Sequence, residues 1–328
     1  MKRFLLPLAA LLALASCSGK GAQAAAETAE AAEDSIPVVY FTSEITPESL
    51  LRIYQALGAD TDGKKVAVKI STGESEKSNQ LAPELIAPLV SAVNGTIVEC
   101  NTAYEGNRRH TAEHLQTVER HGYTAIAPVD IMDAEGDTTI AIPGGKHIQT
   151  DIVGNHISDY DFMLVLSHFK GHQMGGFGGA LKNLSIGVAS SNGKAWIHSA
   201  GTCADADSIW GHIAEQDDFI EAMADAAHGV VAYYGPGNTA YVNVANNLSV
   251  DCDCNGNPAT PEMADLGIFA SLDPVAVDQA AVDMVFAADS TSGNASLVER
   301  INSRHGIKIL PAAEELGTGS RRYRLVRL

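Results

Sequence analysis

Residues 162–167 have the sequence FMLVLS, and residues 168–182 continue as HFKGHQMGGFGGALK. A strand that is apolar at every position is typical of the centre of a parallel sheet, where both faces are buried. The glycine-rich segment that follows is typical of a turn from such a strand into a helix. These 21 residues therefore predict an α/β fold with a ligand-binding edge where the strand ends.

Short apolar runs and amphipathic segments alternate on both sides of this strand, which predicts a mostly parallel sheet with helices on both faces. We also expect a β-hairpin at 138–152 and a C-terminal extension, residues 291–328, that packs on one α/β domain, residues 36–290. The predicted strands are 38–41, 65–70, 96–100, 124–128, 162–167, 241–250 and a final strand or tail at 322–327. The predicted helices are 49–57, 81–93, 111–120, 217–233 and 273–287.

The composition supports one folded chain and excludes one class of partner. Of 328 residues, 45% are hydrophobic and 19% are charged, which favours a large buried core over disorder. The formal net charge is −18, whereas a nucleic-acid surface needs a basic field. We expect no nucleic-acid partner.

The N-terminus has the features of an export signal. Lys2 and Arg3 precede an apolar run, Phe4–Ala15, whose twelve residues are too few to span a bilayer. The run ends in Leu14-Ala15-Ser16-Cys17, which resembles a bacterial lipobox, so we expect a signal peptide at 1–16 and acylation of Cys17. The alternative is an ordinary signal peptide with an incidental cysteine.

Residues 17–35 are polar or small and predict a flexible tether. If the lipobox interpretation holds, the protein is anchored to a lipid bilayer through the acylated Cys17. It then belongs to the bacterial cell envelope and faces the periplasm or the outside.

The glycine-rich segment is a candidate site for an anion. Closely spaced glycines let backbone N–H groups approach a ligand, and the next helix offers its N-terminus. The alternative is a tight turn with two solvated histidines, and Lys182 is then a surface lysine. The candidate binding residues here are Gly175, Gly176, Phe177, Gly178, Gly179 and Lys182.

Four blocks of the sequence carry a family resemblance. These blocks resemble the signatures of domain-of-unknown-function family 362, the "iron–sulfur centre" proteins, and they occur in the same order along the chain. They are ECNTAYEGNR (99–108), HFKGH with GFGGALKN (168–183), DCDC (251–254) and DLGIFASLDPVAVDQA (265–280). The likeness runs from about Val38 to Phe286. It adds Asn101 and Arg108 to the candidate binding residues, although an arginine beside another arginine is also typical of a solvated loop.

The chain departs from this family at one point. Many members carry a ferredoxin-type cysteine insert after the His-Ser pair that resembles His198-Ser199, but here only Cys203 follows. A four-iron four-sulfur cluster needs four thiolates, so we expect none.

A shorter resemblance concerns residues 176–182, GFGGALK, which are similar to the GFSGGRK stretch of nickel-pincer lactate racemases. Three of the seven residues differ, at Gly178, Ala180 and Leu181. This likeness implies a shared fold and a shared cofactor-binding corner rather than shared chemistry.

The DCDC block and the two histidines form a candidate metal site. His168, His172, Cys252 and Cys254 are ligand types that Zn²⁺ or Fe²⁺ accepts. A bond between Cys252 and Cys254 is not expected, because a strand would point both side chains the same way. Two alternatives stay open, a disulfide to Cys100 or Cys203 and a pair of buried, inert thiols.

The sequence predicts where these groups meet but not what they do. His168 follows one predicted strand and the DCDC block another, so both should lie at the same edge of the sheet. Two function classes remain open. One is an enzyme or cofactor carrier for a small anionic molecule, with His168 and Lys182 as candidate catalytic residues. The other is a non-catalytic binding or scaffold lipoprotein that keeps the site as structure only.

Overall fold

The computed structural model describes residues 36–328, so the predicted signal peptide, Cys17 and the predicted tether lie outside the described residues. An eight-stranded sheet forms the centre, in the order β12-β1-β11-β10-β7-β2-β3-β4. Within it only β11 is antiparallel, pairing in that sense with β1 and β10. The α/β prediction is confirmed. The strands of this sheet are β1 (Val38–Thr42), β2 (Val66–Lys69), β3 (Thr96–Glu99), β4 (Val129–Ile131), β7 (Phe162–His168), β10 (Thr239–Ala245), β11 (Gly267–Ser271) and β12 (Arg324–Arg327).

Strand β7 is buried at all seven positions, and its side chains alternate between the two faces of the sheet. Phe162, Leu164 and Leu166 belong to the core under α2 (Pro47–Gln55) and α3 (Pro83–Ala92). Met163 and Val165 belong to the larger core on the other face. Two apolar faces on one strand explain why its sequence lacks polar alternation.

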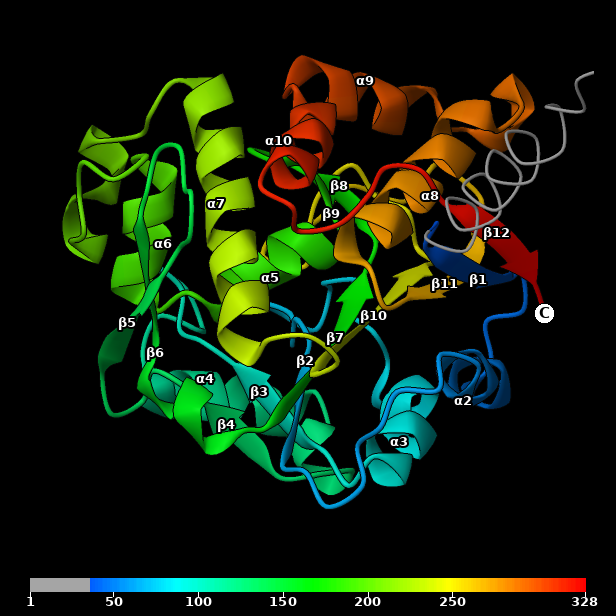
Figure 1. Ribbon diagram of the computed structural model, residues 1–328, viewed down its shortest axis with the longest axis horizontal. Helices are drawn as coiled ribbons and strands as arrows, with labels where there is room; N and C mark the ends of the chain where they lie inside the picture. The colour runs from blue at the N-terminus through cyan, green and yellow to red at the C-terminus, as the bar shows by residue number, and fades with distance from the viewer. Residues whose placement is uncertain (1–35) are drawn as a thin grey trace, which may run out of the picture. The chain divides into compact units, whose positions relative to one another are not determined.

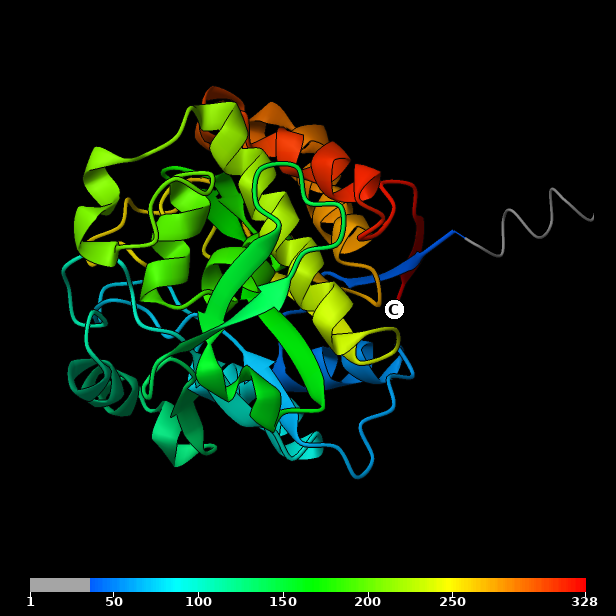
Figure 2. The same ribbon diagram turned by 60° about the vertical axis from the view of Figure 1, so that its left-hand side comes forward.

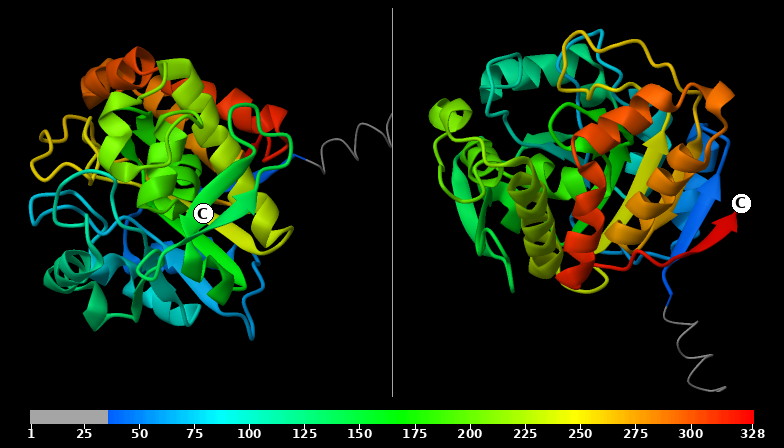
Figure 3. Two further views of the ribbon diagram at one scale, coloured as in Figure 1. Left: turned by 90° about the vertical axis from the view of Figure 1, so that its left-hand side faces the viewer. Right: turned by 90° about the horizontal axis from the view of Figure 1, so that it is seen from above.

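The larger core lies under the helices α5, α7, α8 and α10, which Figures 1 and 3 show grouped on one face. Helix α7 contacts both α5 and α10, and α8 packs on β10 and β11. The helices not yet bounded are α4 (Thr111–Arg120), α5 (Ala180–Val188), α6 (Ser191–His198), α7 (Gln216–Tyr234), α8 (Pro274–Ala287), α9 (Ala295–Ser303) and α10 (Ile309–Glu315).

Two short hairpins stand apart from the sheet. The expected hairpin consists of β5 (Asp137–Ala141) and β6 (Thr150–Gly154), which Figure 2 shows against α7. A second hairpin, β8 (Lys170–His172) with β9 (Gly176–Gly178), takes up the glycine-rich segment that we expected to be a loop.

Two strand boundaries were wrong. The strand predicted at 124–128 is a 3₁₀ turn at Tyr123–Ala125 followed by β4, because the buried Tyr123 hydroxyl donates to the carbonyl of Leu81 at 2.6 Å and holds the turn. The strand predicted at 241–250 ends at Ala245, because the chain turns at Asn247, whose φ is +46°. The DCDC block therefore lies beyond a loop rather than directly after a strand.

The C-terminal segment 291–328 contributes two helices that pack on the folded unit and one strand that joins its sheet. Helix α10 contacts α7, α9 contacts β8 and β9, and β12 adds to the sheet beside β1. No helix within residues 36–328 is long and apolar enough to cross a membrane.

Candidate functional site

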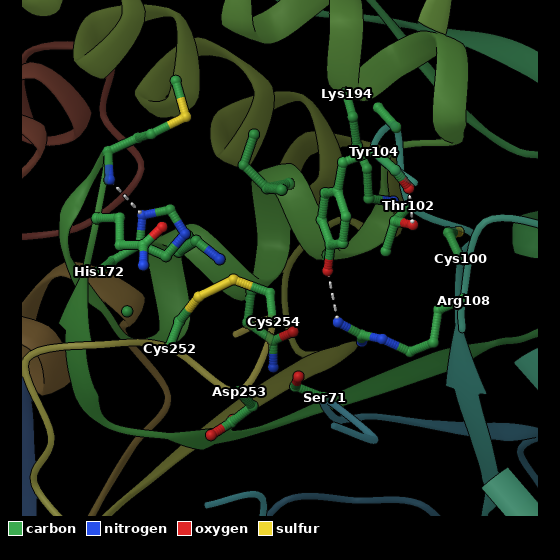
Figure 4. Close-up of a pocket in the computed structure, with 18 of the residues that line it drawn as sticks. Ser71, Cys100, Thr102, Tyr104, Arg108, His172, Lys194, Cys252, Asp253 and Cys254 are labelled. Carbon is green, nitrogen blue, oxygen red and sulfur yellow. Dashed lines mark hydrogen bonds between the residues drawn. A yellow bond between two sulfur atoms is a disulfide. The ribbon is translucent and has the colours of Figure 1, made fainter. Parts of the chain in front are cut away.

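A cavity of about 280 Å³ opens where β2, β3 and β7 end. Lys69, Glu99 and Ser167, each at or next to the carboxyl end of its strand, line its floor. The β8–β9 hairpin, the start of α5 and the DCDC loop line its walls (Figure 4). Parallel strands bring their carboxyl ends to one edge, which is why residues far apart in sequence meet here.

Asp278 on α8 fixes the turn into α5. Its carboxylate accepts the backbone N–H groups of Ala180 at 2.7 Å and Leu181 at 2.9 Å, and the Nδ2 of Asn243 at 2.7 Å. Burial raises the pKa of Asp278 to about 6, against these hydrogen bonds, which lower it. The expectation that this helix N-terminus receives an anion from solution is wrong, because the protein's own carboxylate occupies it.

The glycines of this segment have two different roles. Gly178 and Gly179 line the cavity, whereas Gly175, Gly176 and Phe177 do not. Gly176 has a φ of +79°, and a Cβ there would lie 2.8 Å from the Cα of Gly306. Its lack of a side chain therefore allows a close backbone contact rather than ligand access.

Asn101 also lies outside the cavity lining. Its Nδ2 donates to Thr111 at 2.9 Å, and its Oδ1 lies 3.2 Å from the Nδ1 of His114. Asn101 thus ties the loop after β3 to α4.

The cavity is cationic in an acidic protein. Among the described residues that line it are five lysines and arginines and two carboxylates, and both carboxylates are fully engaged. Glu99 accepts from Lys69 at 2.8 Å, from the backbone N–H of Thr72 at 2.8 Å and from Arg108 at 3.1 Å. Burial opposes ionisation of Glu99, but the charges of Lys69 and Arg108 outweigh it and hold its pKa well below the usual range.

Asp253 is the second carboxylate. It accepts from His168 at 2.8 Å and from Lys170 at 2.7 Å. Their charges lower its pKa despite its burial. Asp253 is 1% exposed and forms a buried ion pair with these two side chains.

Arg108 lines the cavity but is already paired. It donates to Glu74 at 3.1 Å, to Glu99 and to the Tyr104 hydroxyl at 2.9 Å. Glu74 is 7% exposed and holds this arginine in place. Arg108 therefore supplies positive potential to the cavity with its donors directed at protein groups.

Of the five cations that line the cavity, Lys182 and Lys194 make no ion pair with a carboxylate within residues 36–328. Lys182 is partly buried as a residue, and its Nζ makes no hydrogen bond within residues 36–328. Burial, and then the charge of Lys170, lower its pKa to about 7. Lys194 is 7% exposed, donates to the carbonyl of Ala189 at 2.6 Å, and has a pKa lowered by burial.

Three histidines line the cavity with different hydrogen bonding. Both ring nitrogens of His168 face acceptors, Asp253 and the carbonyl of Asn246 at 2.6 Å. The Nδ1 of His172 accepts the N–H groups of Met174 at 3.2 Å and Gly175 at 2.8 Å, so its Nε2 carries the proton. His198 donates from Nδ1 to the carbonyl of Lys194 at 2.6 Å, which leaves a lone pair on Nε2.

Cys252 and Cys254 form a disulfide with each other, so our expectation that they would not is wrong. The DCDC block is a turn rather than a strand, and the turn points both sulfur atoms together. The pair lies beside His172, whose ligand atom and theirs are within 4.8 Å of one another (Figure 4).

This group has the spacing of a metal site but not its chemistry. A disulfide offers no thiolate, and a His172 whose Nδ1 accepts two N–H bonds has no lone pair left on Nε2. His168 has no free nitrogen either. The predicted Zn²⁺ or Fe²⁺ set of His168, His172, Cys252 and Cys254 does not fit a metal in this state.

The sequence reasoning missed several cavity residues. Lys69 and Lys194 carry no motif, and Glu99 and His198 lie in blocks that resemble the family but were not singled out as site residues. One signal was present: a lysine at the end of an otherwise apolar strand, VAVK (66–69), indicates a buried partner. The remaining contacts depend on tertiary structure.

Fold and site together define an α/β protein with a cationic cavity at the carboxyl edge of its sheet. The chain belongs to the family of the domain of unknown function DUF362, whose model matches residues 66–283. Among solved structures it is similar to the lactate racemase apoprotein from Thermoanaerobacterium thermosaccharolyticum, at 17% identity and a TM-score of 0.36. That match covers 62% of this chain and half of the racemase chain. No curated protein matches the chain.

Proposed function

We propose that this protein binds a small, multiply charged anion in the cavity between the β8–β9 hairpin and α5. The observation that carries this proposal is the excess of buried or partly buried cations, five against two carboxylates. Burying an unpaired cation costs free energy, and a bound anion recovers it. Lys182, which has no partner among the described residues, is the side chain best suited to contact such a ligand.

The size of the cavity restricts the ligand. About 280 Å³ admits a molecule of a few carbon atoms with two or more carboxylate or phosphate groups, but no polymer. The donors are also mixed in kind. His172 presents an N–H, His198 a lone pair, and Lys182 an amine whose pKa of about 7 lets it gain or lose a proton near neutrality.

These groups support an enzyme better than a scaffold. An amine that titrates near neutral pH beside an anion site is suited to proton transfer. A resident Zn²⁺ or Fe²⁺ at the Cys252–Cys254 pair is the lesser candidate, for the reasons of bonding given above. We further propose that Cys17 is acylated and anchors the protein to the cell envelope.

Sulfate tests the binding proposal, because it is small, divalent and keeps its charge across the pH range used. We expect sulfate to bind the purified protein and Lys182→Met to weaken binding at least about tenfold, the value of one charged hydrogen bond. Trp210, which lines the cavity and is 64% exposed, provides a fluorescence readout beside calorimetry.

The matched control is Lys77→Met, which removes an exposed lysine outside the cavity and should leave the affinity unchanged. Equal affinities for the wild type and Lys182→Met, or no measurable binding, would contradict the proposal. Loss of folding in the variant is excluded by comparing its circular dichroism and unfolding midpoint with those of the wild type.

A further inference from the structure

The disulfide between Cys252 and Cys254 lies in the wall of the proposed anion cavity. Both cysteines line the cavity; Cys252 is 2% exposed, and Cys254 is partly buried (Figure 4). A reagent can therefore reach this bond from the cavity. The other two described cysteines differ: Cys100 and Cys203 are free and buried, and burial raises the pKa of the Cys100 thiol.

The bond does little to hold the fold together. It joins residues two apart, and a cross-link of such short span removes little conformational freedom from the unfolded chain. Other contacts already hold the turn: the backbone N–H of Glu74 donates to the carbonyl of Asp253 at 2.9 Å, and the Asp253 side chain is bound by His168 and Lys170. Opening the bond should leave the turn in place.

The surroundings favour thiol chemistry at this bond. His172 lies beside it, and its Nε2 carries a proton that a departing thiolate can accept as a hydrogen bond. Lys182 and Lys170 line the same cavity and supply the positive potential that stabilises thiolates. A thiol that itself carries carboxylates would gain from the same charges.

We propose that the Cys252–Cys254 disulfide is an exchangeable redox centre whose co-reactant is a small anionic thiol held by the cavity cations. This inference rests on the proposed anion binding and adds a substrate class to it.

The exchange balances as two successive displacements. The thiolate of one small molecule attacks the Sγ of Cys254, the sulfur–sulfur bond breaks, and Cys252 leaves as a thiolate that takes up a proton. A second small thiolate then attacks the sulfur of the first in the mixed disulfide and releases Cys254. Two thiols become one small-molecule disulfide, and the protein gains two thiols.

The test compares three thiols at equal thiolate concentration on the folded protein: mercaptosuccinate, which is anionic, 2-mercaptoethanol, which is neutral, and cysteamine, which is cationic. Newly formed thiols are alkylated, and the peptide with Cys252 and Cys254 is quantified by mass spectrometry. We expect mercaptosuccinate to react about tenfold faster than 2-mercaptoethanol, and cysteamine to react slowest. Sulfate should slow mercaptosuccinate by competition.

Lys182→Met should abolish the preference for the anionic thiol, and Lys77→Met should keep it. The double variant Cys252→Ser with Cys254→Ser should fold and still bind sulfate, because the turn does not depend on the disulfide. A bond that resists all three thiols until the protein unfolds, or one that reacts at equal rates with them, overturns the inference. If the oxidised protein binds sulfate in those cases, the proposed anion site stands and only the redox role fails.

Discussion

Lys182 makes anion binding depend on pH. Burial and Lys170 lower its pKa to about 7, while Lys69 and Arg108 act in the same direction and Asp253 opposes them. A bound anion favours the ammonium form and raises this pKa in the complex. Below pH 7 the amine is charged with or without ligand, so the affinity is high and constant.

Above pH 7 the free protein loses that proton, and sulfate affinity should fall by up to about tenfold per pH unit. Calorimetry from pH 6 to 9 measures this slope. Lys182→Met should bind weakly with a flatter profile, and an identical slope in both proteins would show that another group is responsible.

Glu99 links the stability of the protein to the charge of its cavity. Its folded-state pKa lies below the ordinary value of 4.5, so its contribution is complete above that pH and is lost as the pH falls through the folded value. Glu99→Gln leaves Lys69 and Arg108 without their shared carboxylate.

We expect Glu99→Gln to lower the free energy of unfolding by about 3–5 kcal/mol at pH 7, and by less as the pH falls below 4.5. The same substitution removes a negative charge from the cavity, so sulfate should bind more tightly. Urea unfolding at pH 4 and pH 7 checks the predicted loss of stability, and calorimetry checks the predicted gain in sulfate affinity. Unchanged stability with unchanged affinity would mean that this ion pair is of little consequence.

At the scale of elements, the turn into α5 depends on the fit between Gly179 and Asp278. A Cβ at Gly179 would lie 2.3 Å from the Oδ1 of Asp278, whereas a Cβ at Gly178 would lie at an ordinary 3.5 Å from the Lys182 side chain. Gly179→Ala should displace the carboxylate that caps α5 and lower the free energy of unfolding by about 1–3 kcal/mol.

Gly178→Ala is the matched control, one residue earlier, and should change stability by less than about 0.5 kcal/mol. Urea midpoints of the two variants provide the comparison. Equal midpoints would refute the capping role of Asp278.

The helices and strands were predictable where the local sequence pattern identifies each of them. The buried strand at 162–167 and the alternation of strands and helices around it predicted the parallel sheet. Because parallel strands end at the same edge of a sheet, the sequence also predicted the edge where His168 and the DCDC block lie. Strand β11 was not predicted, because GIFAS (267–271) is short and its antiparallel place between β1 and β10 depends on pairing across the sheet.

The candidate site was predictable only in part, for a related reason. Lys182 and the cysteines stood out through their motifs, but which groups pair is decided in three dimensions. Glu74 and Arg108 are 34 residues apart, and nothing local marks them as partners. The disulfide forms because residues 251–254 make a turn. We expected a strand there, and a strand would not bring the two sulfur atoms together.

At the scale of the whole molecule, the attachment to the envelope should depend on one residue. No helix within residues 36–328 can cross a bilayer, and a chain of net charge −18 is repelled by anionic lipid headgroups. The lipobox-like stretch Leu14–Cys17 is the sequence feature that favours acylation of Cys17, with residues 17–35 as the proposed tether.

We expect the wild-type protein to sediment with membranes and to require detergent for release, and Cys17→Ala to appear in the soluble fraction without incorporating labelled palmitate. Ser18→Ala, which keeps the cysteine, should behave as the wild type. Because the cavity residues described above lie within 36–328, the released variant should bind sulfate with unchanged affinity, which separates loss of the anchor from loss of the fold. Membrane association that persists in Cys17→Ala would refute the lipid anchor and would require a protein partner in the envelope instead.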